Sequence, residues 1–349
     1  MFSSLVAYTI VMLPIVTQIC EELCLDRNSK FAKMMFLSTM WVILIGYIAT
    51  PIGHEVPVLI LGLFEVTFGI KASLTKYMVV CMPVAFMMLL LVNIYFRFVV
   101  RPDVSDYEKY NVSEKQSEIK PMDKREKTVV AIFFLVVFLL IGPELLKSVF
   151  PKLYELSARV GLVSPVIFGV CLLCILKIED KPLMVFSDVL SKVMWPQVFL
   201  AAGTYALVAV MGLESTGITL WLTNIMDPLF VGTTSWLPFI LVVACLCAVL
   251  TQFMSCTVVA NMVFIVSVPI AVSLFRVVNP YAVGILIAFM PSIGVMTPPA
   301  STPASIYLSC GWLSPADGLK HGFVMMLIDI VLSVFVLYLL CCIVFPYTA

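Results

Sequence analysis

Two interruptions in long apolar segments constrain the fold of this chain most strongly. The predominantly apolar segment Trp236–Leu308 contains a break at Ser255–Thr257 and a proline-rich break at Thr297–Pro303. An unpaired backbone N–H or C=O is costly in hydrocarbon, so irregular backbone at membrane depth persists only where protein covers it or where it lines a wet cavity. Each interruption therefore predicts a polar site inside the membrane.

The composition indicates that most of the chain lies in a lipid bilayer. Apolar residues make up 62% of the 349 positions and charged residues 12%, and the mean hydropathy is +1.10. These values are typical of all-α polytopic membrane proteins, and we expect a multi-pass protein of the cell (plasma) membrane. The formal net charge is zero, which argues against nucleic acid as a partner. The eleven cysteines and two histidines show no zinc-type spacing, so we expect reduced thiols.

A further broken helix precedes a charged segment. The apolar stretch Met34–Ile70 is longer than the roughly 20 residues that cross a bilayer. Thr50–Pro57 interrupts this stretch with two prolines and a glycine, which one regular helix does not accommodate. The polar segment Arg101–Lys127 follows, and residues 97–127 hold eight of the 21 Lys and Arg residues. This excess of positive charge predicts a cytoplasmic linker.

Several segments after the linker have the length of membrane helices: Thr128–Ser148, Leu162–Ile178, Trp195–Met211 and Gly322–Phe345. Between the last two of these we expect a re-entrant hairpin over residues 236–275, with both ends outside, and a broken helix over residues 281–308. Asp329 lies within the last span. It either faces a wet crevice or lies near enough to the interface to be hydrated, and we favour the interface.

The two halves share an order of elements. Ser255 precedes Thr297 by 42 positions, and Ser4 precedes Thr50 by 46, each pair joining an apolar arm to a broken helix. Corresponding interrupted segments in two halves indicate a transporter with inverted repeats. The expected domains are a partial first repeat (1–100), the linker (101–127) and a second repeat (128–349).

These motifs resemble the divalent-anion:sodium symporters, whose signature is Ser-Asn-Thr at each hairpin tip and a Thr-Pro-Pro-Asn-like break in each following helix. Ser255–Thr257 is similar to the second tip, with Cys256 in place of asparagine, and Ser301–Ser305 is similar to the second break. Gly46–Val58 resembles the first break, although His54 and Glu55 differ from the family pattern.

The resemblance implies a scaffold subdomain that forms a homodimer and a transport subdomain that moves by an elevator-like displacement. The similarity begins at the first hairpin tip, so the first repeat is expected to be incomplete. We therefore expect that the 349-residue chain does not transport alone.

The breaks supply neutral oxygen atoms, which favour sodium, whereas proton coupling would need an ionisable group. The cation-binding candidates are Ser255, Thr257, Thr297, Ser301 and Thr302. The substrate-binding candidates, which would contact carboxylate or sulfate oxygens, are Ser255, Cys256, Thr257, Thr302, Pro303 and Ser305. The first-site candidates are Ser4, Thr50, Gly53 and His54.

Alternatives exist for some of these side chains. The hydroxyls of Ser255 and Thr257 either bind a ligand or bond back to the preceding helical turn. His54 either adds charge-assisted anion binding or caps carbonyls freed at the first break.

The expected function is secondary active transport: symport of small di- or tricarboxylates or sulfate, coupled to sodium, by elevator-like alternating access. Na+ is the expected coupling ion, and no other cofactor is expected. The alternative is a truncated or degenerate membrane protein that does not transport, or a partner subunit. An enzyme is not expected, because no Ser/His or paired-Asp constellation occurs at membrane depth.

Overall fold

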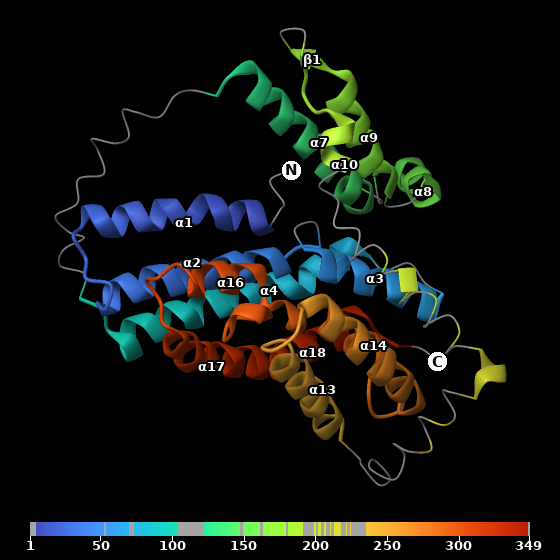
Figure 1. Cartoon of the computed structure of the whole chain (residues 1–349). Helices are drawn as coiled ribbons and strands as arrows, with labels where there is room; N and C mark the ends of the chain where they lie inside the picture. The colour runs from blue at the N-terminus through green and yellow to red at the C-terminus, as the bar shows by residue number, and fades with distance from the viewer. Residues whose placement is uncertain are drawn as a thin grey trace. The chain divides into compact units, whose positions relative to one another are not determined.

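The computed structural model describes residues 5–51, 54–69, 73–103, 122–146, 149–160, 163–178, 181–190 and 235–347, with scattered positions between 199 and 224. Contacts divide the chain into a smaller unit, residues 111–200, and a larger unit, residues 2–110 with 201–349. The described residues are helical apart from connecting segments and one pair of two-residue strands (Figure 1).

The smaller unit is built on α7 (Lys124–Leu145), which packs against α8 (Pro151–Val160) and α9 (Val163–Ile175). Strands β1 (Lys177–Ile178) and β2 (Lys181–Pro182) pair antiparallel and precede α10 (Phe186–Leu190). Arg125 donates to the carbonyls of Pro182 and Leu183, both at 3.0 Å. Helices α7 and α9 occupy two of the expected spans, whereas α8 and the strands were not predicted. The expected span 195–211 lies largely outside the described residues.

The larger unit contains both broken helices and the hairpin. Its elements are α1 (Leu5–Glu22), α2 (Lys30–Ile48), α3 (Glu55–Phe68), α4 (Leu74–Ile94), η1 (Tyr95–Val100), η2 (Glu214–Thr216), α13 (Leu237–Leu250), α14 (Cys256–Ser273), α15 (Pro280–Phe289), η3 (Met290–Ser292), η4 (Pro298–Ala300), α16 (Thr302–Leu308), α17 (Pro315–Leu332), η5 (Ser333–Leu337) and α18 (Tyr338–Val344).

Four described helical stretches are long and apolar enough to cross a membrane: Lys30–Ile48, Leu74–Val100, Cys256–Ser273 and Pro315–Val344. Together with the shorter apolar helices between them, these stretches agree with the expected all-α polytopic class.

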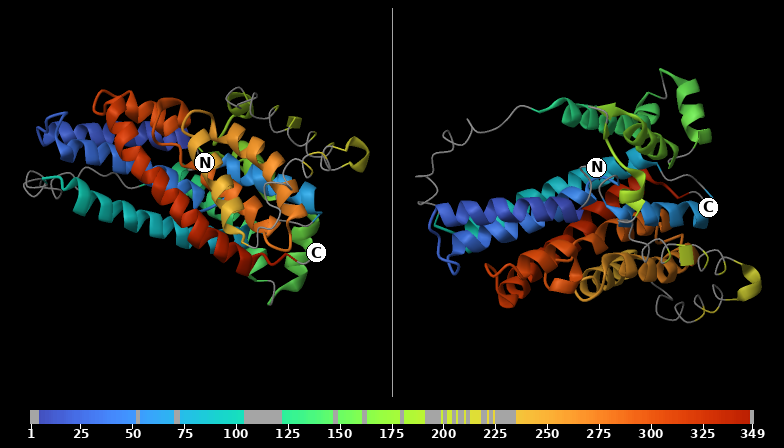
Figure 2. Two further views of the ribbon diagram at one scale, coloured as in Figure 1. Left: turned by 90° about the horizontal axis from the view of Figure 1, so that it is seen from below. Right: turned by 45° about the horizontal axis from the view of Figure 1, so that its top comes forward.

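The two broken helices pack against each other in opposite chain directions. Helix α2 packs against α16, and α3 packs against α15, so the first half of each broken helix contacts the second half of the other (Figures 1 and 2). Gly284 of α15 permits the close approach, because a Cβ there would lie 3.1 Å from the Phe64 ring of α3. The first break (residues 49–54) and the second break (residues 290–301) therefore lie at the same level of the unit.

Proline chemistry sets the extent of the second break. Helix α15 ends at Phe289, earlier than the predicted break at Thr297–Pro303. Pro291 has no N–H to donate to the preceding turn, so the chain continues as the short 3-10 turn η3 and then without regular structure over residues 293–295. At the first break, Pro57 remains within the first turn of α3, where a backbone N–H has no intrahelical partner.

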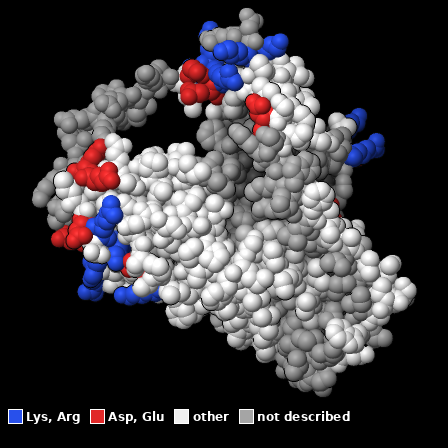
Figure 3. Space-filling view, viewed as in Figure 1, with Lys and Arg blue, Asp and Glu red and all other residues white. Residues whose placement is uncertain are grey.

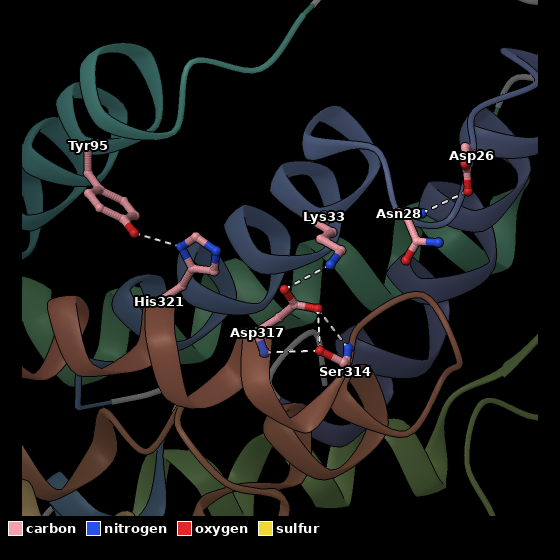
Figure 4. Close-up of polar contacts among 7 residues, drawn as sticks. All are labelled: Asp26, Asn28, Lys33, Tyr95, Ser314, Asp317 and His321. Atoms are coloured by element: carbon pink, nitrogen blue, oxygen red, sulfur yellow. Dashed lines mark hydrogen bonds and ion pairs between the residues drawn. The ribbon is translucent and has the colours of Figure 1, made fainter.

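Charged side chains gather at the end of the larger unit where α1 connects to α2, and Figure 3 shows an uncharged surface beyond them. Lys33 Nζ lies 2.9 Å from Asp317 Oδ1, joining α2 to α17, and Asp317 forms a capping box with Ser314. The Tyr95 hydroxyl lies 2.6 Å from His321 Nδ1, joining η1 to α17. These contacts, drawn in Figure 4, fix the start of α17 beside α2 and η1.

The favoured interfacial placement of Asp329 is wrong. Its side chain is 1% exposed and accepts a hydrogen bond from Ser333 Oγ at 3.2 Å. The continuous helical stretch begins at Pro315, rather than at Gly322, and ends at Val344. Asp329 consequently lies at the middle of the stretch instead of near an end.

Two glycines of α17 allow the second break to approach this helix. A Cβ at Gly318 would lie 2.8 Å from the Met296 carbonyl oxygen, and one at Gly322 would lie 2.9 Å from Met296 Cα. Because both neighbours are backbone atoms, a side chain at either position would force the break away from α17.

We predict that Gly322→Ala lowers the free energy of unfolding by about 1–3 kcal/mol, the range for overpacking a close contact. Thermal unfolding of the detergent-solubilised protein measures the change. Gly46→Ala is the matched control, because a Cβ at Gly46 meets nothing within 4 Å. Equal unfolding temperatures for the two variants would contradict the close contact between α17 and the break.

Candidate functional site

The hairpin tip (Thr251–Ser255) contacts the second break through one buried amide side chain, Gln252. Its Nε2 donates to the carbonyls of Ala248 at 2.9 Å and Ile293 at 3.1 Å. Its Oε1 accepts the N–H groups of Val295 and Met296, both at 3.0 Å. The carboxamide thus pairs one acceptor and two donors of the irregular backbone of the second break.

Hydroxyl groups add to the same contact. Thr251 Oγ1 donates to the Pro291 carbonyl at 2.5 Å, and Thr297 Oγ1 donates to the backbone carbonyl of Gln252. Ser301 Oγ donates to the Gly294 carbonyl at 2.6 Å. Carbonyls of the break are therefore paired by side chains from the tip and from the break itself.

The predicted cation ligands Thr297 and Ser301 lie within this contact. Their protons are donated to backbone carbonyls, and Ser301 Oγ also accepts the Ala304 N–H as the N-cap of α16. A hydroxyl oxygen has two lone pairs, so each oxygen retains capacity toward a ligand. Thr297 and Ser301 therefore stabilise the backbone of the break, and their oxygen atoms can still bind a cation.

The other predicted residues of the second site lie at the starts of two helices. Ser255 is the N-cap residue of α14, is exposed, and makes no side-chain cap hydrogen bond. Cys256 is half-buried and Thr257 is buried. Thr302 and Ser305 are exposed in α16, whereas Pro303 is buried. The hydroxyls of Ser255, Thr302 and Ser305 are therefore open to a ligand, whereas Thr257 and Pro303 pack inside the protein.

The first-site candidates are partly described. His54 is buried, and its Nδ1 accepts the Val56 N–H at 3.0 Å. It therefore caps a helix N–H rather than the freed carbonyls considered from the sequence. Thr50 is half-buried after the end of α2, whereas Ser4 and Gly53 lie outside the described residues. Helix α3 packs against both α14 and α15, which brings the first broken helix to the hairpin.

The site offers neutral ligands and helix N-termini. No cluster of three or more His, Cys, Asp or Glu side chains that could hold a metal occurs among the described residues. Hydroxyl, amide and carbonyl oxygens suit alkali and other hard cations better than transition metals. Helices α3 and α14 both begin beside a break, and the positive end of a helix dipole favours an anion. The arrangement therefore suits a small cation and an anion together.

Sequence reasoning missed Thr251 and Gln252. A glutamine inside an apolar hairpin was the available signal, because a buried amide is costly unless it is hydrogen-bonded. The backbone groups of the second break that Gln252 pairs lie more than 40 positions away along the chain. Their identity could not be derived without the structure.

We predict that Gln252→Met destabilises the protein, because it leaves four buried backbone groups without partners at roughly 1–3 kcal/mol each if none relaxes. The unfolding temperature in detergent measures the loss. Gln18→Met is the matched control, since Gln18 is exposed and its Nε2 donates to the exposed Glu22 Oε1 at 2.9 Å. A Gln252→Met variant as stable as this control would show that the amide does not hold the break.

Residues 9–345 match the family model described as "Sodium:sulfate symporter transmembrane region". The sodium-dependent dicarboxylate transporter SdcS of Staphylococcus saprophyticus is 26% identical over 358 aligned residues. SdcS of Staphylococcus aureus strain USA300 is 26% identical over 352. Each alignment covers 97% of this chain and 66% of the relative, so the chain spans slightly less than two thirds of the relatives' length.

These findings confirm that the chain belongs to a class of membrane transporters. The relatives are named as transporters and not as enzymes, and the matched family is a transmembrane one coupled to sodium. Together with the apolar helices, the match confirms an integral protein of the plasma membrane. It also confirms the family resemblance drawn from the Ser255–Thr257 and Ser301–Ser305 motifs. Since the family model covers nearly all of the sequence, the chain belongs to the sodium:sulfate symporter transmembrane family.

Proposed function

We propose that this chain carries out sodium-coupled symport of a small dianion, either a dicarboxylate or sulfate. The observation that supports this most directly is the packing of two broken helices in opposite directions, with their breaks at one level and the hairpin tip on the second break. Discontinuous helices in inverted repeats are where secondary transporters bind substrate and ion. The family description mentions sulfate and the relatives' name mentions dicarboxylates.

The division into two compact units supports an elevator-like mechanism. All described candidate site residues belong to the larger unit, and α7, α8 and α9 belong to the smaller one. We propose that the larger unit is the transport subdomain and carries its bound ion and anion as one body. The smaller unit would then contribute to the scaffold, through which the protein would form a homodimer.

The roles of individual residues follow from their chemistry. Hydroxyl oxygens of Ser255 and Thr257 would bind sodium together with Thr297, Ser301 and Thr302. Thr302 and Ser305 would donate to oxygens of the anion, alongside Ser255, Cys256, Thr257 and Pro303. Thr50 and His54 would belong to a first site completed by Ser4 and Gly53.

Uptake of labelled succinate and labelled sulfate into proteoliposomes tests the function. Uptake driven by a sodium gradient, and absent with a choline gradient of equal strength, is the expected result. Absence of sodium-driven uptake would contradict the proposed function.

The Ser255→Ala and Thr257→Ala variants should each raise the sodium concentration for half-maximal uptake, by roughly tenfold per 1.4 kcal/mol of lost binding free energy. Each substitution removes one oxygen ligand and leaves the apolar arm unchanged. Ser273→Ala, at the exposed far end of α14, serves as control. Wild-type half-saturation in both tip variants would exclude their hydroxyls as ligands.

The hairpin should enter and leave the membrane on one side. Helix α13 has 14 residues, which rise about 21 Å at 1.5 Å per residue, short of a hydrocarbon core of about 30 Å. In a variant without native cysteines, Ser235→Cys and Val277→Cys should react with an impermeant thiol reagent from the same side. Reaction from opposite sides would show that α13 and α14 together cross the bilayer an odd number of times.

A further inference from the structure

Two buried polar side chains beneath the hairpin tip lack protein partners. Asn261 is 4% exposed and Ser292 is 1% exposed. Neither the Nδ2 nor the Oδ1 of Asn261 has a hydrogen-bond partner, and the same holds for Ser292 Oγ. Asn261 is the only described side chain that leaves two such buried atoms open. Thr251 and Gln252 of the hairpin tip, by contrast, donate to carbonyls of the second break.

Both open side chains belong to elements that pack together. Asn261 lies one helical turn after Thr257 in α14, so the two share a face, and both are buried. Ser292 lies in η3 between two residues whose carbonyls accept from the tip, Pro291 and Ile293. Helix α14 packs against η3 as well as against α15. Asn261 and Ser292 thus belong to two elements, α14 of the hairpin and η3 of the second break, that pack against each other.

The cost of these open groups argues for a ligand. Leaving a buried polar atom unpaired costs roughly 1–3 kcal/mol, and inside a membrane there is no bulk water to compensate. The neighbouring polar groups of the tip and break are paired by protein, so a ligand entering between α14 and η3 would find open oxygen atoms at Asn261 and Ser292. Both oxygens are neutral, and no cluster of acidic, histidine or cysteine ligands accompanies them in the described chain.

We propose that Asn261 Oδ1 and Ser292 Oγ are ligands of a sodium ion bound between α14 and η3. The site lies about one to two turns below Ser255, at 1.5 Å of helix rise per residue, and is distinct from the exposed hydroxyls of the tip. Asn261 Nδ2 remains free to donate to water or to the co-transported anion. The proposal rests on the sodium coupling proposed above.

Sodium-dependent stability tests the site without requiring transport. A bound ion raises the unfolding temperature by mass action, so the purified wild type should become more stable as NaCl replaces choline chloride at constant ionic strength. Asn261→Leu and Ser292→Ala should each shift the half-effective sodium concentration upward by roughly tenfold or more, which corresponds to 1.4 kcal/mol. The controls are Asn93→Leu, at an exposed asparagine of α4, and Ser267→Ala, at a buried serine of α14. Both should keep the wild-type response.

A carboxylate variant covers the case in which Asn261→Leu fails to fold. Asn261→Asp retains two oxygen atoms, and its negative charge should make the unfolding temperature depend more steeply on sodium than in the wild type. A sodium response that is unchanged in Asn261→Leu, or an Asn261→Asp variant that sodium does not stabilise, would overturn the site.

Failure of this site and failure of the proposed function give different results. Sodium-driven uptake by the wild type, together with an unchanged sodium response in the Asn261 and Ser292 variants, would refute this site alone. No sodium-specific stabilisation and no sodium-driven uptake in the wild type would refute both.

Discussion

The architecture depends on how the backbone of the second break is paired in the absence of bulk water. Residues 294–296 lack helical hydrogen bonds, and in hydrocarbon their polar groups need partners from elsewhere in the protein. Gln252 donates to the Ile293 carbonyl and accepts the N–H groups of Val295 and Met296. The hydroxyls of Thr251, Thr297 and Ser301 donate to carbonyls of the break and the tip. The hairpin tip therefore has to lie on the break, and α13 and α14 are oriented by that requirement.

The same constraint links the two halves of the chain. Because α2 packs against α16 and α3 against α15, the irregular backbone of both broken helices is surrounded by helices of the opposite half. Gly284 lets the Phe64 ring of α3 approach α15 closely, and Gly318 and Gly322 let the backbone of the second break approach α17. Neutral oxygen atoms and helix N-termini are thereby gathered at one level. This combination suits an anion and a small cation, in agreement with the family to which the chain belongs.

Sequence analysis predicted the elements better than their contacts. Apolar length and proline spacing are local properties, so the helices, the hairpin segment and both interruptions could be placed approximately from the sequence. The second break begins at Met290, earlier than predicted, because Pro291 already ends the helix before the proline-rich residues 298–303. The roles of Gln252, Asn261 and Ser292 depend on contacts between α13, α14 and η3, which residue order does not specify. Asp329 was misplaced because the last helical stretch begins seven residues earlier than predicted.

Hydrogen–deuterium exchange of the protein in lipid nanodiscs tests the central claim, which is that the irregular backbone of the second break is held by Gln252. The Val295 and Met296 amides have no helical partner but donate to Gln252 Oε1 at 3.0 Å. They should exchange as slowly as amides in the middle of α15. Exchange at the rate of an exposed loop would contradict the account, because the break would then be open to water rather than paired with the hairpin tip.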